Sequence, residues 1–236
     1  MTVVKKLALL AAVAASIAAL PDSAAYAAGS GGSMSTPSIP DVQRERTPED
    51  LAKSAYNAGY RHIKKAAKLE EDAAEATKPE KKQKALDKAQ SAYEKALGEF
   101  AKATDNAPAM HEAWNYIGYA QRKLGRYDSA LSAYGEALRL KPDYAQAIEY
   151  RGEAYLGLNR LEDARKAYLD LFAGSRDLAG QLLTAMKSYV EQRRAAPNGV
   201  DAQALEQFAQ WVSERETIAL QTAMLDTGAG SSASWR

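Results

Sequence analysis

Residues 111–142 read HEAWNYIGYAQRKLGRYDSALSAYGEALRLKP, and this stretch decides the fold because its pattern recurs. A forward shift of 34 residues places Gly118 on Gly152 and Tyr134 on Tyr168. An ordinary helical bundle, the alternative, has helical periodicity but no reason to keep that shared phase. A period of roughly 34 residues with two helices per unit predicts a stacked array of helical hairpins. Such arrays usually bind other proteins.

The stretch also carries the residues that close packing of two helices needs. Gly118 is small enough to let antiparallel helices approach, and we expect the rings of Trp114 and Tyr134 to fill the core between layers. Gly125 can take the left-handed conformation that ends the first helix. Asn159 holds the same place one unit later, and Asn is the next-best residue for that conformation.

The pattern resembles the tetratricopeptide repeat (TPR) family. That family places a Trp and then an apolar–Gly pair in its first helix, an Ala, an aromatic residue and an Ala in its second, and a closing Pro. The residues in those roles are Trp114, Ile117, Gly118, Ala130, Tyr134, Ala137 and Pro142. The next unit, 145–178, has Ile148 instead of the Trp and Arg176 instead of the Pro, and 93–108 is half-matched. The resemblance implies an all-α solenoid that binds proteins.

Start and stop signals extend this all-α fold, a TPR-like helical-hairpin solenoid, beyond the repeats. Thr47, followed by a proline and two acids, predicts a helix start, and Pro79 predicts the next start after a long first helix. Pro197-Asn198-Gly199 predicts a turn between two further helices. Because a solenoid end needs a polar cap, the last pair is interpreted as a C-terminal capping hairpin or a degenerate unit. The predicted helical domain spans 47–225, with a long N-terminal hairpin at about 48–110, units at 111–144 and 145–178, and C-terminal helices at 176–225.

The N-terminus has the features of a secretory signal peptide over residues 1–28. Lys5-Lys6 precedes an apolar run at 7–20, and small residues suit cleavage after Ala27 or Ala28. The run is shorter than the roughly 20 residues that span a bilayer. We therefore expect a periplasmic or secreted protein with no stable membrane insertion after processing. An uncleaved anchor or a buried helix is the alternative.

Two segments outside the helices are rich in residues that resist regular structure. Residues 29–46 contain Gly, Ser and Pro and are predicted to be a disordered linker. Residues 226–236 are rich in Gly and Ser and are predicted to be a flexible tail.

The charge balance and the scarcity of reactive side chains exclude several classes of function. With 31 Lys plus Arg against 30 Asp plus Glu, the chain lacks the basic excess of a nucleic-acid-binding protein. It has no Cys and two histidines, His62 and His111, so we predict no metal site and no cofactor. It has neither a phosphate-cradling Gly-Lys-Ser/Thr sequence nor a nucleophile elbow. We therefore predict no catalytic residue and a non-enzymatic protein.

The predicted partner-binding surface is the concave face formed by the first helices of the units. Residues spaced by three and four share one face of a helix, and by resemblance to the family these positions meet a ligand peptide. They are Glu112, Asn115, Tyr119, Arg122 and Lys123, then Gln146, Glu149 and Glu153, with Lys53, Tyr56 and Tyr60 added if Gly59 matches Gly118. We expect this face to lie opposite the packed side. Ordinary solvated residues are the alternative.

The charges of this face suggest the kind of ligand. Arg122 and Lys123 suit a carboxylate, while Glu149 and Glu153 suit a Lys or Arg. The family's clamp for a C-terminal carboxylate combines Lys and Asn residues, and Glu149 stands where such a clamp needs a donor. This departure favours a mixed-charge internal segment.

Taken together, these features predict an adaptor or scaffold of the bacterial envelope that holds a peptide or partner protein in a concave TPR groove. The alternative is a self-associating structural protein. It would form homo-oligomers through the charged arm of the long hairpin or through the C-terminal cap.

Overall fold

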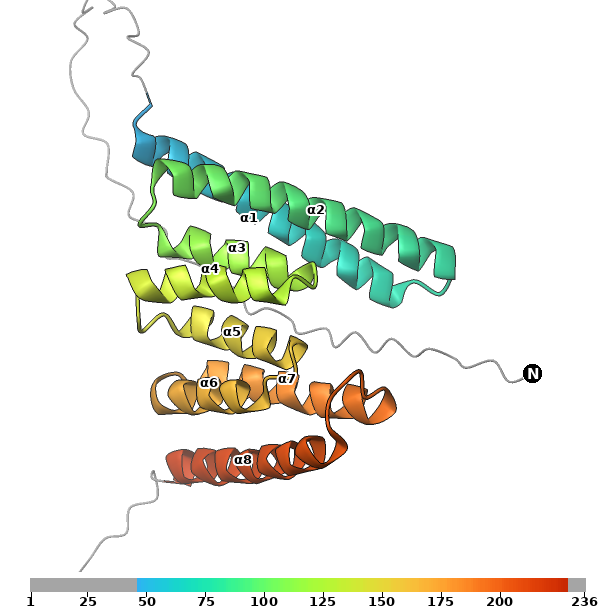
Figure 1. Ribbon diagram of the computed structural model, residues 1–236. Coiled ribbons are helices and arrows are strands. Elements are labelled where there is room, and N and C mark those ends of the chain that lie inside the picture. Colours follow the sequence, from blue (N-terminus) through green and yellow to red (C-terminus); the bar gives the residue numbers. More distant parts are fainter. Residues whose placement is uncertain (1–45, 229–236) are drawn as a thin grey trace, which may run out of the picture.

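The computed structural model describes residues 46–228, with side chains to 222, and this part of the chain is all-helical (Figure 1). The helices are α1 (Pro48–Glu75), α2 (Pro79–Asn106), α3 (His111–Lys123), α4 (Tyr127–Leu140), α5 (Ala145–Gly157), α6 (Leu161–Gly174), α7 (Arg176–Ala195) and α8 (Ala202–Gly228). The last helix ends slightly beyond the predicted 225. The predicted signal peptide and residues 29–45 of the predicted linker lie outside the described residues.

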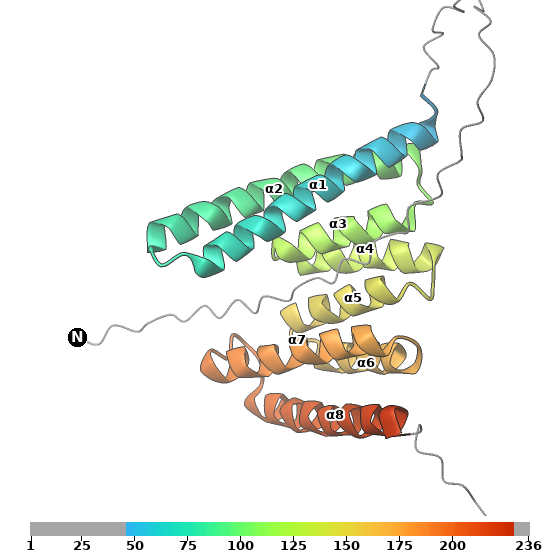
Figure 2. The ribbon, with the colours of Figure 1, turned by 180° about the vertical axis from the view of Figure 1, so that it is seen from behind.

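The helices pair into hairpins that stack in sequence order (Figures 1 and 2). The hairpin α1–α2 forms one end of the stack, α3–α4 and α5–α6 follow, and α7–α8 forms the other end. The first helix of each hairpin packs on the hairpin before it: α3 on α2, α5 on α4, and α7 on both α5 and α6. The predicted all-α helical-hairpin solenoid is confirmed.

Local sequence signals explain where the helices begin and end. At the start of α1, the Thr47 hydroxyl accepts a hydrogen bond from the Asp50 backbone N–H at 3.1 Å, and the Asp50 carboxylate accepts one from the Thr47 N–H at 3.3 Å. This reciprocal cap satisfies two backbone donors that a helix start leaves open. Gly125 and Asn159 have φ angles of 74° and 58°, the left-handed conformation predicted for the turns after α3 and α5.

Glycines set the close approach of the paired helices. A Cβ added at Gly118 of α3 would lie 2.5 Å from Cε1 of Tyr134 in α4, and one at Gly59 of α1 would lie 2.8 Å from Cε1 of Phe100 in α2. The ring of the second helix thus rests directly on the glycine of the first in both hairpins. The contact identifies α1–α2 as a hairpin of the same kind and aligns Gly59 with Gly118.

This alignment shows that the first hairpin carries a long insertion. The glycine and the aromatic residue are 41 positions apart in α1–α2 and 16 apart in α3–α4, so the first hairpin has 25 additional residues. They lie at 65–75 and 79–92, which we call the arm. At 1.5 Å per residue, the arm extends about 15–20 Å beyond the other hairpins, and it projects to one side of the stack (Figure 1).

The two aromatic residues predicted to be core have different environments. Tyr134 is fully buried, as predicted. Trp114 is only partly buried, and its indole N–H donates a hydrogen bond to the Pro108 carbonyl at 2.9 Å. The prediction that Trp114 fills the core is therefore wrong: the residue is partly exposed, and its indole N–H is bonded to the connection between α2 and α3.

Replacing Trp114 with alanine is expected to lower the free energy of unfolding by about 1–3 kcal/mol, because a half-buried ring loses less than a fully buried one. Trp114→Phe keeps a ring but loses the hydrogen bond to Pro108, and its expected cost is about 1 kcal/mol. Urea unfolding followed by circular dichroism measures both values. A loss for Trp114→Ala as large as that of a fully buried aromatic residue would contradict this account.

The last hairpin turns its apolar side to the solenoid. Leu182 of α7 lies on Gly152 of α5, where an added Cβ would be 2.6 Å from Leu182 Cδ2. From α8, Phe208 is fully buried, and Trp211 packs edge-on against Tyr168 of α6 with a ring-centroid separation of 5.4 Å. The hairpin therefore covers the apolar end of the α5–α6 pair.

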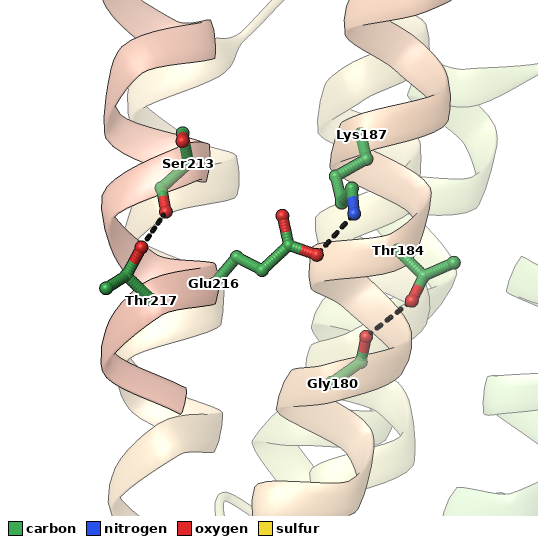
Figure 3. Close-up of polar contacts among 6 residues, drawn as sticks. All are labelled: Gly180, Thr184, Lys187, Ser213, Glu216 and Thr217. Atoms are coloured by element: carbon green, nitrogen blue, oxygen red, sulfur yellow. Dashed lines mark hydrogen bonds and ion pairs between the residues drawn. The ribbon is translucent and has the colours of Figure 1, made fainter. Parts of the chain in front are cut away.

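The other side of α7–α8 is polar. An open groove between the two helices is bordered by the ion pairs Lys187–Glu216, shown in Figure 3, and Arg194–Glu206, whose atoms are 2.6 Å apart. Nearby, the Thr184 hydroxyl donates to a backbone carbonyl one turn earlier in its own helix (Figure 3). A polar outer side is what the end of a solenoid needs to remain soluble.

Candidate functional site

Six partly buried tyrosines gather along the first helices, and we call them the tyrosine face. They are Tyr56 and Tyr60 of α1, Tyr116 and Tyr119 of α3, Tyr144 in the turn before α5, and Tyr150 of α5. Five of them form an unbroken series of ring contacts. The centroid separations are 5.4 Å for Tyr60–Tyr116, 6.2 Å for Tyr116–Tyr119 and 5.0 Å for Tyr119–Tyr150. The face therefore crosses three consecutive hairpins.

Hydrogen bonds join the sixth tyrosine to this series. The Tyr144 hydroxyl donates to the Gln146 side-chain oxygen at 3.0 Å, and the Gln146 amide donates to the Tyr150 hydroxyl at 3.1 Å. The ring of His111 packs edge-on against Tyr144 with centroids 4.8 Å apart. Burial raises the pKa of the Tyr144 and Tyr150 hydroxyls, so both keep their protons at neutral pH.

Arg122 joins the second and third hairpins through a buried ion pair with Glu153, which we call the strut. Its Nη1 lies 2.5 Å from Oε2 of Glu153 in α5, and its side chain is 12% exposed. The guanidinium carbon is 5.2 Å from the ring centroid of Tyr119 and 5.3 Å from that of Tyr150, so two rings flank the charge. Such an arrangement stabilises a partly desolvated arginine by an ion pair and cation–π contacts, while its buried Nε has no hydrogen-bond partner among the described residues.

Glu149 is a second carboxyl beside the same strut. It is 2% exposed, and its Oε2 has no hydrogen-bond partner among the described residues. Burial, together with the negative charge of Glu153, raises the pKa of Glu149 to about 9, against the opposing effect of Arg122. Because Arg122 is already paired with Glu153, Glu149 is the carboxyl that holds a proton at neutral pH.

Glu149→Gln is expected to make the protein more stable than the parent at alkaline pH. A buried carboxyl with a raised pKa stabilises the fold below its unfolded pKa of about 4.5, and this stabilisation is lost as the pH rises towards 9. The advantage of the variant should therefore grow between pH 6 and 9 by at most about 1.4 kcal/mol per pH unit. Urea unfolding at four pH values measures the difference in unfolding free energy. The exposed Glu75→Gln is the control, and the same pH dependence of unfolding free energy for the two variants would count against a raised pKa of Glu149.

The two neighbouring basic residues are also engaged within the chain. Lys123 Nζ lies 2.6 Å from Oε2 of Glu70 in the arm, and it sits 5.8 Å from the ring centroid of Tyr93. Arg126, in the turn after α3, pairs with Glu94 of α2. Both contacts tie the second hairpin to the first.

The structure brings the predicted surface residues together but buries two of them. Asn115 is fully buried, neither of its side-chain amide atoms has a partner among the described residues, and it occupies the repeat position of Glu149. Asn115 and Glu149 therefore do not lie opposite the packed side, contrary to the prediction, because both side chains are buried. Glu112 remains open to solvent at 44% side-chain exposure, with Oε2 3.2 Å from His111 Nδ1.

Three members of the face, Tyr116, Tyr144 and Tyr150, were absent from the sequence-based set. A signal for two of them was present, because the 34-residue shift places Tyr116 on Tyr150. Both lie beside positions that were singled out, one residue after Asn115 and Glu149. No comparable signal points to Tyr144, which precedes its helix.

Two further properties of the described residues concern other kinds of site. Over 46–228, no group of three or more His, Asp or Glu side chains is arranged to hold a metal ion. Within the same range, no helix is both long enough and apolar enough to cross a membrane.

The stacked hairpins and the aromatic face on their first helices place the protein among the helical-repeat proteins. Residues 111–144 match the family model of the tetratricopeptide repeat. The match covers one unit of the chain, the α3–α4 hairpin, and that unit is similar to the family.

Comparisons with solved structures and curated proteins give the following results. The solution structure of the first TPR domain of the human RPAP3 protein is 20% identical, with 72% of this chain and 98% of that chain covered and a TM-score of 0.41. The first TPR of Spaghetti (RPAP3), bound to the HSP90 peptide SRMEEVD, is 21% identical, with 66% and 95% covered and a TM-score of 0.34. A search of curated proteins finds no match.

Proposed function

We propose that the protein is a non-enzymatic interaction adaptor or scaffold of the bacterial envelope that holds a peptide or partner-protein segment on the tyrosine face. The observation that carries the proposal is the continuity of this face across α1, α3 and α5. Tyrosine offers a large contact area at small entropic cost, and its hydroxyl adds hydrogen bonds at the rim. An extended partner segment can follow such a surface from one hairpin to the next.

The titratable groups of the site support binding rather than catalysis. The cluster of Arg122, Glu149 and Glu153 is buried between α3 and α5, where it joins two hairpins. A perturbed carboxyl can mark an active site, but structural ion-pair networks perturb pKa values in the same way. The contacts of Arg122 with two hairpins favour the structural role.

Site-specific photo-crosslinking in the native host tests where a partner binds. A benzophenone amino acid is introduced at Tyr60 or Gln146 on the face, and at Ser132 or Lys166, which are exposed on the second helices α4 and α6. We expect irradiation to give the same adduct from both face positions and none from the two controls. Adducts from the control positions alone, or from none of the four, would refute the proposed site.

The envelope location rests on the N-terminal sequence and has its own test. Lys5-Lys6, the apolar run and the small residues at Ala27 and Ala28 favour export and removal of residues 1–28. N-terminal sequencing of protein from the native host should give Ala28 or Gly29 as the first residue. An intact Met1 on most molecules would refute the proposed location in the envelope.

Self-association through the arm is a second candidate, favoured by the projection of the arm and its divided charge. The α1 part, 65–75, has two Lys and four acids, whereas the α2 part, 79–92, has four Lys and two acids. Two copies could pair the acidic edge of one with the basic edge of the other. Sedimentation equilibrium at low and high salt tests this. A monomer under both conditions refutes self-association, and a salt-sensitive dimer supports it.

A further inference from the structure

Four lysines form a row along one side of α2, and we call them the lysine row: Lys81, Lys84, Lys88 and Lys95. Their spacing of three, four and seven residues places them on the same side of a helix with about 3.6 residues per turn. All four are exposed. Among the described residues, the ion pairs of lysine form elsewhere, and none of these four takes part in one. The row is therefore a line of free positive charges.

The lysine row lies on the side of α2 that faces away from the second hairpin. On α2, Tyr93 packs against Tyr119 of α3 with ring centroids 6.2 Å apart, and Glu94 pairs with Arg126 in the turn after α3. At about 100° per residue, the row is centred roughly 160° round the helix from Tyr93 and Glu94. Because α1–α2 forms one end of the stack, the row belongs to the outer end of the solenoid (Figures 1 and 2).

The positive charge of this side remains after the neighbouring acids of α2 are counted. Between residues 79 and 102, α2 has six lysines and four acids. Glu94 is engaged by Arg126, and Glu99 lies 2.6 Å from Lys102. The two remaining acids stand against five lysines and lie about 70–90° round the helix from the row: they are Glu80 and Asp87.

The acids of α1 do not cancel this charge either. Three of the four acids in the α1 part of the arm have a lysine within 3.3 Å: Glu70, Glu71 and Asp72. Glu75, at the tip of the arm, is the fourth. Lys65 is exposed and lies about 140° round α1 from Glu70, which faces α3, so it adds to the charge of the outer end.

The arm provides most of this charged surface. Lys81, Lys84 and Lys88 lie within its α2 part, so a hairpin without the inserted residues would keep Lys95 alone. Consecutive lysines of the row are about 4.5, 6 and 10.5 Å apart along the helix axis. These separations are comparable to the Debye length of about 8 Å at physiological salt, so the four charges act together on an anionic surface. The insertion thus builds a long basic edge on two helices lying side by side.

The side chains of the row suit an extended anionic surface better than a shaped partner. All four cations are lysines, whose compact hydrated charges need no fixed partner geometry, whereas arginine recognises phosphate and carboxylate groups bidentately. The tyrosines of the first hairpin point elsewhere: Tyr56 and Tyr60 contact Tyr116, and Tyr93 contacts Tyr119. The row therefore lacks the aromatic anchors that are typical of protein interfaces and of single-stranded nucleic-acid sites.

We propose that the lysine row docks the outer end of the first hairpin onto the surface of a bilayer that contains anionic phospholipids. The contact is peripheral: the lysine ammonium groups meet the phosphates of the headgroups, and each lysine near the surface adds to the attraction. The tyrosine face lies on other sides of the helices and stays accessible to a peptide. The inference is thus independent of the peptide-binding proposal.

Vesicle flotation tests the inference with the protein as purified from the native host. The vesicles are phosphatidylcholine alone or with about 30% phosphatidylglycerol, at low and high salt. The row variant replaces all four lysines of the row with glutamine. A control variant removes the same total charge from exposed positions on other hairpins: Arg139→Gln, Lys141→Gln, Lys166→Gln and Lys187→Gln.

We expect the parent to bind the anionic vesicles at low salt and to leave them at high salt. The row variant should bind at least about tenfold more weakly, and the control variant should bind like the parent. Absence of binding to the anionic vesicles, or equal weakening in the control, would overturn the proposal. Binding to poly-L-glutamate but not to the vesicles would assign the row to an acidic protein and overturn the bilayer.

Two further measurements keep the test decisive if the row variant does not fold. Asp87→Asn removes an acid beside the row and should strengthen vesicle binding, and an unchanged affinity would contradict the proposal. The chain has no Cys, so one cysteine with an environment-sensitive fluorophore can be placed at Ser91, beside the row, or at Ser132 of α4. Anionic vesicles should change the emission at Ser91 alone. A change at Ser132 of equal size would refute docking through this end.

Discussion

Replacing Arg122 with methionine is expected to lower the free energy of unfolding by about 3–5 kcal/mol. The substitution leaves Glu153 beside Glu149 in a partly desolvated site, without the guanidinium that compensates its charge. Removal of one partner of a buried ion pair costs this much because the other charge remains behind. Loss of the contacts with the Tyr119 and Tyr150 rings adds to the effect.

Two further variants show whether burial causes this loss. Arg126→Met removes the pair with Glu94, which joins neighbouring hairpins at a surface where both side chains are more than 40% exposed, and its cost should stay below about 1 kcal/mol. Arg122→Met combined with Glu153→Leu removes both charges and should restore much of the lost stability. Urea unfolding measures all three. Equal losses for Arg122→Met and Arg126→Met would show that the buried strut has no special role.

The sequence predicted the helices well because their signals are local. Thr47 caps α1, and Gly125 and Asn159 end their helices with positive φ. The repeat register was also predicted correctly. Gly118 was expected to allow close approach of the two helices, and the ring of Tyr134 is in direct contact with it. Trp114 was misplaced because the register fixes its position in the unit but not the geometry of the connection from α2, to which its indole N–H is bonded.

The candidate site was harder to predict because its charges are paired between hairpins. Lys123 meets Glu70 only because the arm lengthens α1 beyond the repeat, and no period relates these two residues. The burial of Asn115 likewise depends on the packing of neighbouring helices, which spacing along one helix does not show. The 34-residue period does place Tyr116 at the position equivalent to Tyr150. Comparison of equivalent positions would therefore have identified these two residues of the face.

Because the hairpins stack, the loss of one contact also affects the hairpins next to it. In a solenoid, stability is approximately a sum of terms within each hairpin and between neighbours. The Gly118–Tyr134 contact lies within the second hairpin, and α3 of that hairpin packs on α2 and also contacts α5. A defect there weakens the unit that carries Tyr116, Tyr119 and the strut to Glu153, so the core of this hairpin and the tyrosine face should be lost together.

Tyr134→Ala is therefore expected to lower the free energy of unfolding by about 3–5 kcal/mol, as for other fully buried aromatic side chains. Gly118 opposite has no side chain, so the cavity left by the ring stays largely empty. Tyr134→Phe keeps the ring and should cost less than about 1.5 kcal/mol. Gly118→Ala in the parent should cost about 1–3 kcal/mol, because its Cβ would meet the Tyr134 ring at 2.5 Å.

The double variant Gly118→Ala/Tyr134→Ala tests the contact itself. With the ring gone, the new methyl group has room, and alanine also favours the helix by roughly 0.5–1 kcal/mol over glycine. The added substitution should then be neutral or stabilising, which gives a coupling energy of at least about 1 kcal/mol between the two positions. Urea unfolding of the four proteins, with equal denaturant slopes as the check on two-state behaviour, completes the cycle. Additive effects would mean that the ring does not rest on Gly118, and the register that aligns Gly59 with Gly118 and defines the arm would fail with it.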